Sequence, residues 1–252
     1  MGFSIDLNCD LGESYFDKKI GNDSEILPLI SSCNIACGMH GGDPLTIQKT
    51  IDLALQNKVN IGAHPSFPDL QNFGRKHMSL SEQELKACLR FQIGAVLEMT
   101  KLRGGIVTHI KPHGALYNSA AVDSELAKMI VDVVKEFDGN LILLGMANSE
   151  MEFVAKEYNL PFVAEVFADR NYADNGVLVS RDFSNAVIID EKKVLKRCVK
   201  MIKDKVVLSE NGKKLNINGQ SICVHGDTLN AVNLVRCLNK GLGENGVSVK
   251  SF

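Results

Sequence analysis

Apolar runs of strand length alternate with amphipathic helical patterns along most of this chain. The runs that predict strands cover residues 3–8, 33–37, 59–64, 105–111, 140–144, 162–166, 186–189, 221–225 and 247–249. The 3.6-residue patterns that predict helices cover residues 44–58, 81–104, 123–137, 151–158, 191–203 and 230–242. This alternation is typical of βα units wound around a parallel sheet.

Local signals fix where several of these elements begin and turn. Asp43 precedes Pro44, which predicts a helix with Asp43 as its N-cap and proline at its first position. Ser81 and Glu84 have the spacing of a capping box. The pair Asn211-Gly212 predicts the turn of a small hairpin over 205–219.

The repeated βα units favour a closed (β/α) barrel, because no glycine-rich dinucleotide fingerprint accompanies them. An open, doubly wound sheet is the alternative. Both folds place a functional site at the carboxyl ends of the strands. No internal repeat or low-complexity linker divides the chain, so we expect residues 1–252 to form a single domain.

Composition excludes several classes of partner. Hydrophobic residues make up 45% of the chain and charged residues 23%, with a net charge of −2, so no basic field attracts nucleic acid or anionic lipid. The seven cysteines form no CxxC pair, which favours reduced thiols over disulfides. Residues 1–9 lack the pattern of a signal peptide, and no apolar run reaches the roughly 18–20 residues of a membrane span. We therefore expect a cytoplasmic protein without membrane contact.

Six short segments run from apolar residues into acids, amides and histidines. They are 5–10, 34–40, 61–65, 109–114, 165–170 and 223–227, and they hold five of the six histidines. If these segments end successive parallel strands, their polar side chains meet at one mouth of the barrel. Such a concentration of proton-transfer groups predicts an enzyme.

Asp6, Asn8 and Asp10 alternate along the first strand, so they share one face. On an interior face, three polar side chains must be paired or hydrated. The alternative is an exposed edge strand that turns this polar face to solvent and buries Leu7 and Cys9.

Histidines follow several strands, and a cluster of them favours chemistry over a merely structural role. His40 lies in a glycine-rich turn, and His64 is fixed by the proline that follows it. His109, Lys111 and His113 alternate and are expected to share a face. Lys111 either has a lowered pKa or serves as a permanent cation beside a developing oxyanion.

The last two segments leave alternatives open. Asp169 and Arg170 either pair to order a loop or clamp a substrate carboxylate, for which the fork of arginine is suited. Asp227 either orients His225 or caps the next helix. No GxSxG elbow or P-loop is present, so neither serine-nucleophile chemistry nor ATP binding by this chain is indicated. Cys37 has aliphatic neighbours that favour a buried thiol over a nucleophile.

Taken together, six motifs closely resemble the LamB/YcsF family in order along the whole chain. They are LNCDLGES at 7–14, SSCNIACGMHGGDP at 31–44, IGAHPSFPDLQNFGR at 61–75, HIKPHGALYN at 109–118, EVFADRNY at 165–172 and ICVHGDT at 222–228. Met39 and Gly41 replace the family's more usual Phe and Ala, and Leu229-Asn230 replaces Pro-Gly. These departures remove no ionisable residue from a motif.

The resemblance implies a seven-stranded barrel of the glycoside hydrolase/deacetylase type. This family contains the A-type component of bacterial 5-oxoprolinase, which works with two other subunits, of B and C type. The implied reaction is cleavage of the lactam of 5-oxoproline to L-glutamate, coupled to hydrolysis of ATP as co-substrate. The missing P-loop agrees with ATP being bound by a partner subunit.

With this reaction in view, we assign roles to the segment residues as predictions. Asp10 and His64 position and deprotonate water, Lys111 and His113 stabilise the oxyanion or phosphate, and Arg170 holds the substrate carboxylate. The further residues expected to bind substrate are Asn8, Asn34, His40, Asp169 and His225.

Whether a divalent metal takes part stays open at this point. Asp10, His64 and His113 occupy places analogous to the Asp-His-His set of barrel deacetylases. The alternative activity is therefore a stand-alone, metal-dependent deacetylase or amidohydrolase acting on a carbohydrate or small amide. A non-catalytic subunit that binds a small carboxylate is a third hypothesis.

Overall fold

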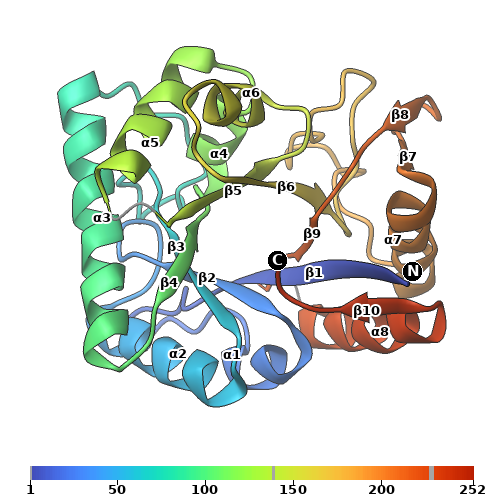
Figure 1. Ribbon diagram of the computed structural model, residues 1–252, viewed down its shortest axis with the longest axis horizontal. Coiled ribbons are helices and arrows are strands. Elements are labelled where there is room, and N and C mark those ends of the chain that lie inside the picture. Colours follow the sequence, from blue (N-terminus) through green and yellow to red (C-terminus); the bar gives the residue numbers. More distant parts are fainter. Residues whose placement is uncertain (1, 138–139, 227–229) are drawn as a thin grey trace.

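Seven parallel strands close into a barrel in the computed structural model, which describes residues 2–137, 140–226 and 230–252 (Figure 1). The barrel strands are β1 (Phe3–Leu11), β2 (Ser32–Ala36), β3 (Asn60–His64), β4 (Val107–Ile110), β5 (Ile142–Met146), β6 (Phe162–Phe167) and β9 (Ser221–Val224). Each strand pairs with the next in this order, and β9 closes the ring by pairing with both β6 and β1. The predicted seven-stranded (β/α) barrel is therefore confirmed.

Helices surround the barrel on its outer side (Figure 1). They are α1 (Asp23–Ile26), the 3₁₀ turn η1 (Leu27–Leu29), α2 (Pro44–Asn57), α3 (Glu82–Leu102), α4 (Gly114–Ala120), α5 (Ser124–Glu136), α6 (Glu150–Glu157), α7 (Glu191–Asp204) and α8 (Ala231–Glu244). Both predicted caps are present: Asp43 accepts hydrogen bonds from the amides of Leu45 and Thr46, and Ser81 and Glu84 form the capping box. No helix in the described ranges is long and apolar enough to cross a membrane.

Further strands lie outside the barrel. The predicted hairpin forms from β7 (Val206–Leu208) and β8 (Lys214–Asn216), which pair antiparallel. The strand β10 (Val247–Val249) pairs with the first residues of β1, next to but not within the closed ring. Beyond β10, the ring of Phe252 packs edge-on against His109, with ring centroids 5.3 Å apart.

The prediction of a strand at 186–189 is wrong. Only a single bridge, between Val187 and Arg170, forms there. The Arg170 side chain donates to the carbonyl of Ala186, so this backbone supports an arginine instead of extending a ladder. The short helix α4 is not predicted by the sequence pattern, because the polar and glycine residues of 109–118 suggest only a loop.

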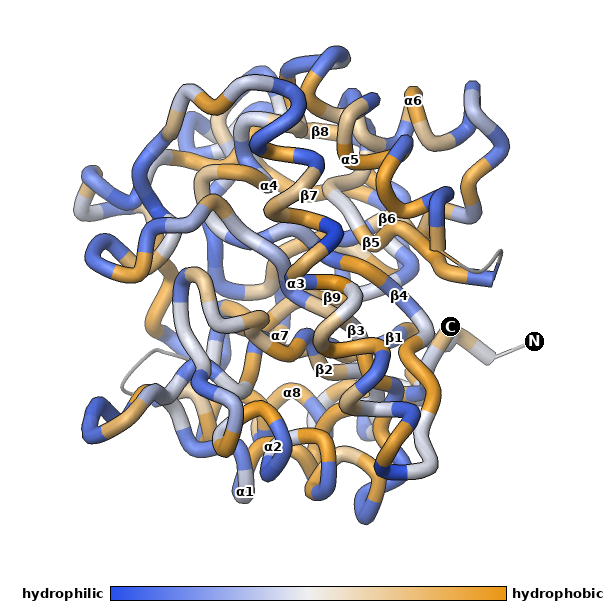
Figure 2. Tube along the Cα trace, turned by 90° about the vertical axis from the view of Figure 1, so that its left-hand side faces the viewer, coloured by the Kyte–Doolittle hydropathy of each residue, from blue (hydrophilic) through white to orange (hydrophobic). Residues whose placement is uncertain are grey.

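The strands divide apolar and polar side chains between their two faces. Leu7 and Cys9 are fully buried on one face of β1, in the core that includes buried side chains of the surrounding helices. The opposite face carries Asp6, Asn8 and Asp10, which are also buried. Figure 2 shows hydrophobic segments concentrated within the molecule and hydrophilic ones at many outer loops. The alternative of an exposed edge strand is therefore wrong.

Gly62 on β3 makes space for a histidine inside the barrel. A Cβ atom on this residue would lie 2.2 Å from Nε2 of His109, which is itself buried. That nitrogen contacts the side-chain oxygen of Asn34 at 2.8 Å, so the ring cannot turn away without losing this contact. Glycine at this position is thus a packing requirement and not a turn signal.

We expect Gly62→Ala to destabilise the fold by about 1–3 kcal/mol, because the added methyl group overpacks a filled barrel interior. Urea denaturation monitored by circular dichroism measures the change. Gly243→Ala is the control, since a Cβ there would meet nothing within 4 Å on helix α8. Equal stability of Gly62→Ala and wild type would show that His109 moves aside freely.

Candidate active site

The carboxyl ends of the barrel strands surround a cavity of about 500 Å³. Its floor includes Asp10, His64, Lys111, His113 and His225. Asp10 lies near the end of β1, His64 ends β3, Lys111 and His113 follow β4, and His225 follows β9. Arg75, Arg170 and Arg181 line the same cavity. The segments predicted to meet at one mouth therefore do so.

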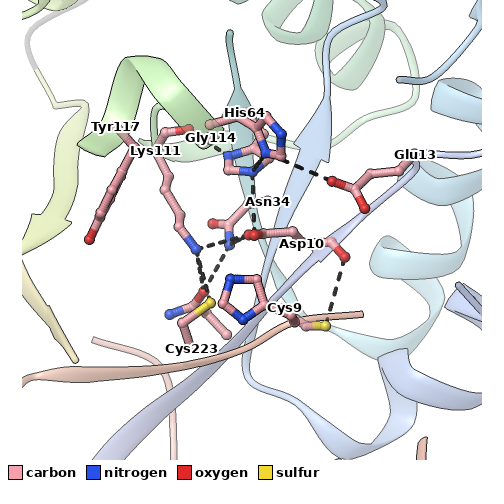
Figure 3. A network of polar contacts seen from close by, with 12 residues as sticks. Cys9, Asp10, Glu13, Asn34, His64, Lys111, Gly114, Tyr117 and Cys223 are labelled. Carbon is pink, nitrogen blue, oxygen red and sulfur yellow. Dashed lines mark hydrogen bonds and ion pairs between the residues drawn. The ribbon is translucent and has the colours of Figure 1, made fainter. Parts of the chain in front are cut away.

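Lys111 lies at the centre of the polar network, as Figure 3 shows. Its ammonium nitrogen lies 2.9 Å from a carboxylate oxygen of Asp10 and 2.9 Å from one of Glu165. It also lies 3.3 Å from Oδ1 of Asn8 and 3.1 Å from Sγ of Cys223. These contacts tie strands β1, β6 and β9 to the end of β4.

Charge pairing decides the ionisation of this network. Burial alone would lower the pKa of Lys111, but the carboxylates of Asp10 and Glu165 outweigh it and hold that pKa well above its usual value. Burial alone would likewise raise the pKa of Asp10, yet His64 and Lys111 hold it well below the ordinary range. Both groups are therefore charged at neutral pH, and Lys111 is a permanent cation.

Below the cavity, amides and hydroxyls satisfy the remaining polar groups of the barrel interior. Asn34 donates to both Asn8 and Asp10 at 2.8 Å, and it contacts His109 on its other side. Asp6 accepts from the hydroxyls of Ser31, Ser32 and Ser221, and burial raises its pKa. Asn34 thus holds Asp10 in place from below the cavity, and Asn8 accepts a hydrogen bond from Asn34.

A histidine cluster forms the other side of the floor. The side chains of Glu13, His40, His64 and His113 are buried, and their ligand-type atoms lie within 4.8 Å of one another. Nδ1 of His113 faces Nε2 of His64 at 3.0 Å. Burial, with His40 and His64 nearby, holds the pKa of His113 well below its usual value, so this ring is neutral at pH 7.

His225 is oriented by Asp169. Nδ1 of His225 lies 3.0 Å from a carboxylate oxygen of Asp169, which is 1% exposed. Although burial would raise the pKa of Asp169, the adjacent His225 keeps it below its ordinary value. Asp227, the other residue considered for this role, lies outside the described residues.

The guanidinium of Arg170 is directed at backbone carbonyls. Its Nε donates to the carbonyl of Ala186 and its Nη2 to that of Val179, so it orders the loop between β6 and α7 while lining the cavity. Burial lowers its pKa to about 10, which leaves the guanidinium charged at neutral pH.

The cysteines of the site are not reactive. Burial raises the pKa of Cys37 to about 12 and that of Cys223 well above its usual value, so both stay protonated at neutral pH. The preference for a buried Cys37 is confirmed, and all seven cysteines are free thiols.

Sequence reasoning missed several members of the site. Glu165 is a lone acid in the otherwise apolar strand β6, and this signal could have identified it. Tyr117 donates to Glu165 at 2.7 Å from the unexpected helix α4. Glu13, Arg75 and Arg181 lie in loops, where the sequence has no helix or strand periodicity from which the direction of a side chain could be predicted.

Comparisons with known proteins agree across the chain. The model of the LamB/YcsF family matches residues 5–252. The A-type component of 5-oxoprolinase from Campylobacter jejuni is 47% identical over 98% of this chain and 97% of its own length. The protein of the same name from Alkaliphilus metalliredigens is 47% identical over 99% and 98%. The crystal structure of a lactam utilization protein from Thermus thermophilus covers 99% of this chain and 100% of its own, with 38% identity and a TM-score of 0.93.

We expect Lys111→Met to destabilise the fold by about 3–5 kcal/mol at pH 7, because it leaves two buried carboxylates without their counter-ion. The unpaired acids then have raised pKa values in the folded state. The stability difference from wild type should therefore narrow as pH falls towards 4 and they take up protons. Urea titrations at pH 7 and pH 5 measure both effects. Lys240→Met, at an exposed lysine of α8, should change nothing measurable.

Proposed function

This chain belongs to the LamB/YcsF family, and from that premise we propose that it is the A-type component of an ATP-dependent 5-oxoprolinase. It opens the lactam of 5-oxo-L-proline to give L-glutamate, with residues 1–252 acting as one domain. The single observation that carries the proposal is the convergence of Asp10, His64, Lys111 and His225 on one cavity, in a chain 47% identical to proteins of that name.

The division of labour follows from the chemistry of the substrate. A five-membered lactam is a resonance-stabilised amide, and water attacks it poorly. Transfer of a phosphoryl group from ATP to the lactam oxygen makes the ring carbon electrophilic. Because this sequence has no P-loop, ATP is assigned to the partner subunits of B and C type. The reaction is placed in the cytoplasm, in agreement with seven free thiols.

The cavity suits a small anionic substrate. Arg170 is fixed in the wall by two backbone carbonyls and stays charged, so it presents a cation without an ordering cost. It holds the carboxylate of 5-oxoproline in this proposal. Arg75 and Arg181 line the same cavity and match the negative charge of a phosphorylated lactam oxygen.

Water is positioned on the opposite side of the cavity floor. Nδ1 of His64 donates to the carbonyl of Lys111 at 2.7 Å, so Nε2, 3.4 Å from Asp10, is the nitrogen that gains or loses a proton. His64 is thus the stronger candidate for the base, while the carboxylate of Asp10 orients the water. Lys111 acts through Asp10, since its ammonium is directed at the acids of the floor.

After water adds to the phosphorylated ring carbon, the C–N bond breaks and the ring nitrogen takes up a proton. The resulting acyl phosphate reacts with a second water to give glutamate and phosphate. His225 lines the cavity, and its Nδ1 lies 3.0 Å from a carboxylate oxygen of Asp169. This pair is the proton donor of the proposal, in the manner of a histidine oriented by a carboxylate. His113 and His40 complete the floor beside His64 and exclude solvent from it.

A divalent metal fits the same floor. His64 and His113 present nitrogens that carry no hydrogen towards each other, as the ligands of a metal do. Such an ion supplies Lewis-acid polarisation of the lactam carbonyl or of water. Asp10 belongs to the Asp-His-His set considered from the sequence. Its Oδ1 already accepts hydrogen bonds from Lys111 and Asn34, so this oxygen is occupied.

The direct test combines the purified chain with B-type and C-type subunits, ATP and 5-oxoproline, and measures glutamate and phosphate together. We expect glutamate only in the complete mixture, in proportion to phosphate. Glutamate from this chain alone without ATP would contradict the division of labour and favour the stand-alone amidohydrolase. Unchanged turnover in an Asp10→Ala complex would favour a non-catalytic, carboxylate-binding role.

We expect Asp169→Asn to lower kcat of the complete complex by about 10²-fold or more, because His225 loses the carboxylate that orients and charges it. KM should change little. Asp52→Asn, on the outer helix α2, is the matched control and should leave turnover unchanged.

A further inference from the structure

Four side chains from four successive strand ends lie together at the cavity floor, and the space among their polar atoms is called the four-residue pocket below. Glu13 follows β1, His40 follows β2, His64 ends β3 and His113 follows β4. All four are buried, and one nitrogen or oxygen from each lies within 4.8 Å of the others. Three imidazoles and a carboxylate are a complete ligand set for a transition metal.

Backbone carbonyls fix which ring nitrogens carry hydrogen. Nδ1 of His64 lies 2.7 Å from the carbonyl oxygen of Lys111, and Nε2 of His113 lies 2.9 Å from that of Phe73. A carbonyl oxygen only accepts, so both of these nitrogens donate. In the neutral rings, the remaining nitrogens are lone pairs, and these two lone pairs face each other at 3.0 Å. Such an arrangement is satisfied by a cation between the two nitrogens, either a shared proton or a metal ion.

His40 adds a buried ring with no hydrogen bond. Both of its nitrogens lack a hydrogen-bond partner among the described residues, although the side chain is fully buried. Leaving such a polar ring unsatisfied is costly. Its Nε2 lies 3.4 Å from a carboxylate oxygen of Glu13, and its ring stacks on that of His113 with centroids 3.7 Å apart. The ring is therefore held with its nitrogens at the pocket.

A strained turn closes over these rings. Phe73 and Gly74 both have positive φ, of 56° and 63°, which is unusual for a bulky phenylalanine. A Cβ on Gly74 would lie 2.8 Å from the His113 ring and 2.9 Å from Cβ of His40. The turn thus presses the backbone onto both histidines and aims the Phe73 carbonyl at one of them. Such outer partners are what orient histidine ligands in metal sites.

We propose that Glu13, His40, His64 and His113 bind one divalent transition metal ion, with zinc as the best match to three imidazoles and one carboxylate. Asp10 is a neighbour of this site and not one of its four ligands, in contrast to the Asp-His-His set expected from the sequence. Lys111 and Asn34 both hold the Asp10 oxygen Oδ1, and the other oxygen is 3.4 Å from His64. The proposal concerns binding by this chain alone. With the ion bound, Nε2 of His64 is a ligand, so the role of base in the proposed reaction passes from His64 to the carboxylate of Asp10.

The test uses the full chain without a histidine tag, in the absence of substrate and partners. Elemental analysis of the purified protein and calorimetric titration of the chelator-treated protein with zinc chloride are expected to give one ion per chain. Cobalt in place of zinc should give the visible absorption bands of a nitrogen- and oxygen-ligated site. The melting temperature should rise when zinc is added.

Two variants locate the site. His40→Gln and Glu13→Gln should each weaken zinc binding by at least about tenfold, as loss of a partner in a metal site does. His77→Gln is the matched control, because His77 lines the cavity outside the four-residue pocket and should bind zinc as wild type does. Circular dichroism of each metal-free variant shows whether it is folded. If one of the two variants does not fold, zinc binding by the other still tests the site.

Three outcomes would overturn the proposal. The first is a wild-type protein that binds no zinc when one ion per chain is supplied. A proton shared between His64 and His113 would then explain the 3.0 Å approach of their nitrogens. The second is unchanged binding in both folded cluster variants. The third is loss of binding in His225→Gln, which would place the ion with Asp10 and Cys223 instead. Each readout is independent of glutamate formation, so failure here and failure of the proposed reaction are distinguishable.

Discussion

The buried ammonium of Lys111 is the constraint on which the site depends. An interior charge is tolerated only when it is paired and hydrogen-bonded, and Lys111 meets acceptors from three other strands. Those acceptors cannot move without leaving a charge unpaired. The alternating acids and amides of β1 are fixed in turn, because Asp10 and Asn8 both touch this nitrogen. One cation thus sets the positions of groups that the sequence places more than 100 residues apart.

The barrel separates stability from chemistry. Its outer face and the surrounding helices form the apolar core, in which Leu7, Cys9 and their counterparts are fully buried. The inner face can therefore carry acids, amides and histidines without exposing apolar surface. This separation explains why the interior is filled by hydrogen bonds, such as those from Asn34 to Asn8 and Asp10, where many barrels are filled by aliphatic side chains.

Much of this arrangement could be predicted from local patterns. The period of two along β1 placed Asp6, Asn8 and Asp10 on one face, and the N-cap Asp43 and the capping box fixed two helix starts. Long-range partners could not be found this way. Asp169 and His225 are 56 positions apart, and no spacing rule links them. The carbonyl that orients His113 belongs to the backbone of Phe73. Every residue has such a carbonyl, so the sequence does not indicate which one is used. Glu165 was visible as a lone acid, but only the closed ring shows that it meets Lys111.

The contact of Phe252 with His109 has a consequence for traffic through the barrel. His109 is fully buried beneath Asn34, and the aromatic ring lies on its side, after the strand that pairs with the first residues of β1. The ring of Phe252 therefore covers part of the barrel interior near the residues with which β1 begins, away from the cavity at the carboxyl ends of the strands. Substrate and products are then expected to share the opening of the cavity. A neighbouring protein seated on that opening would control the pace of exchange without touching the reacting groups.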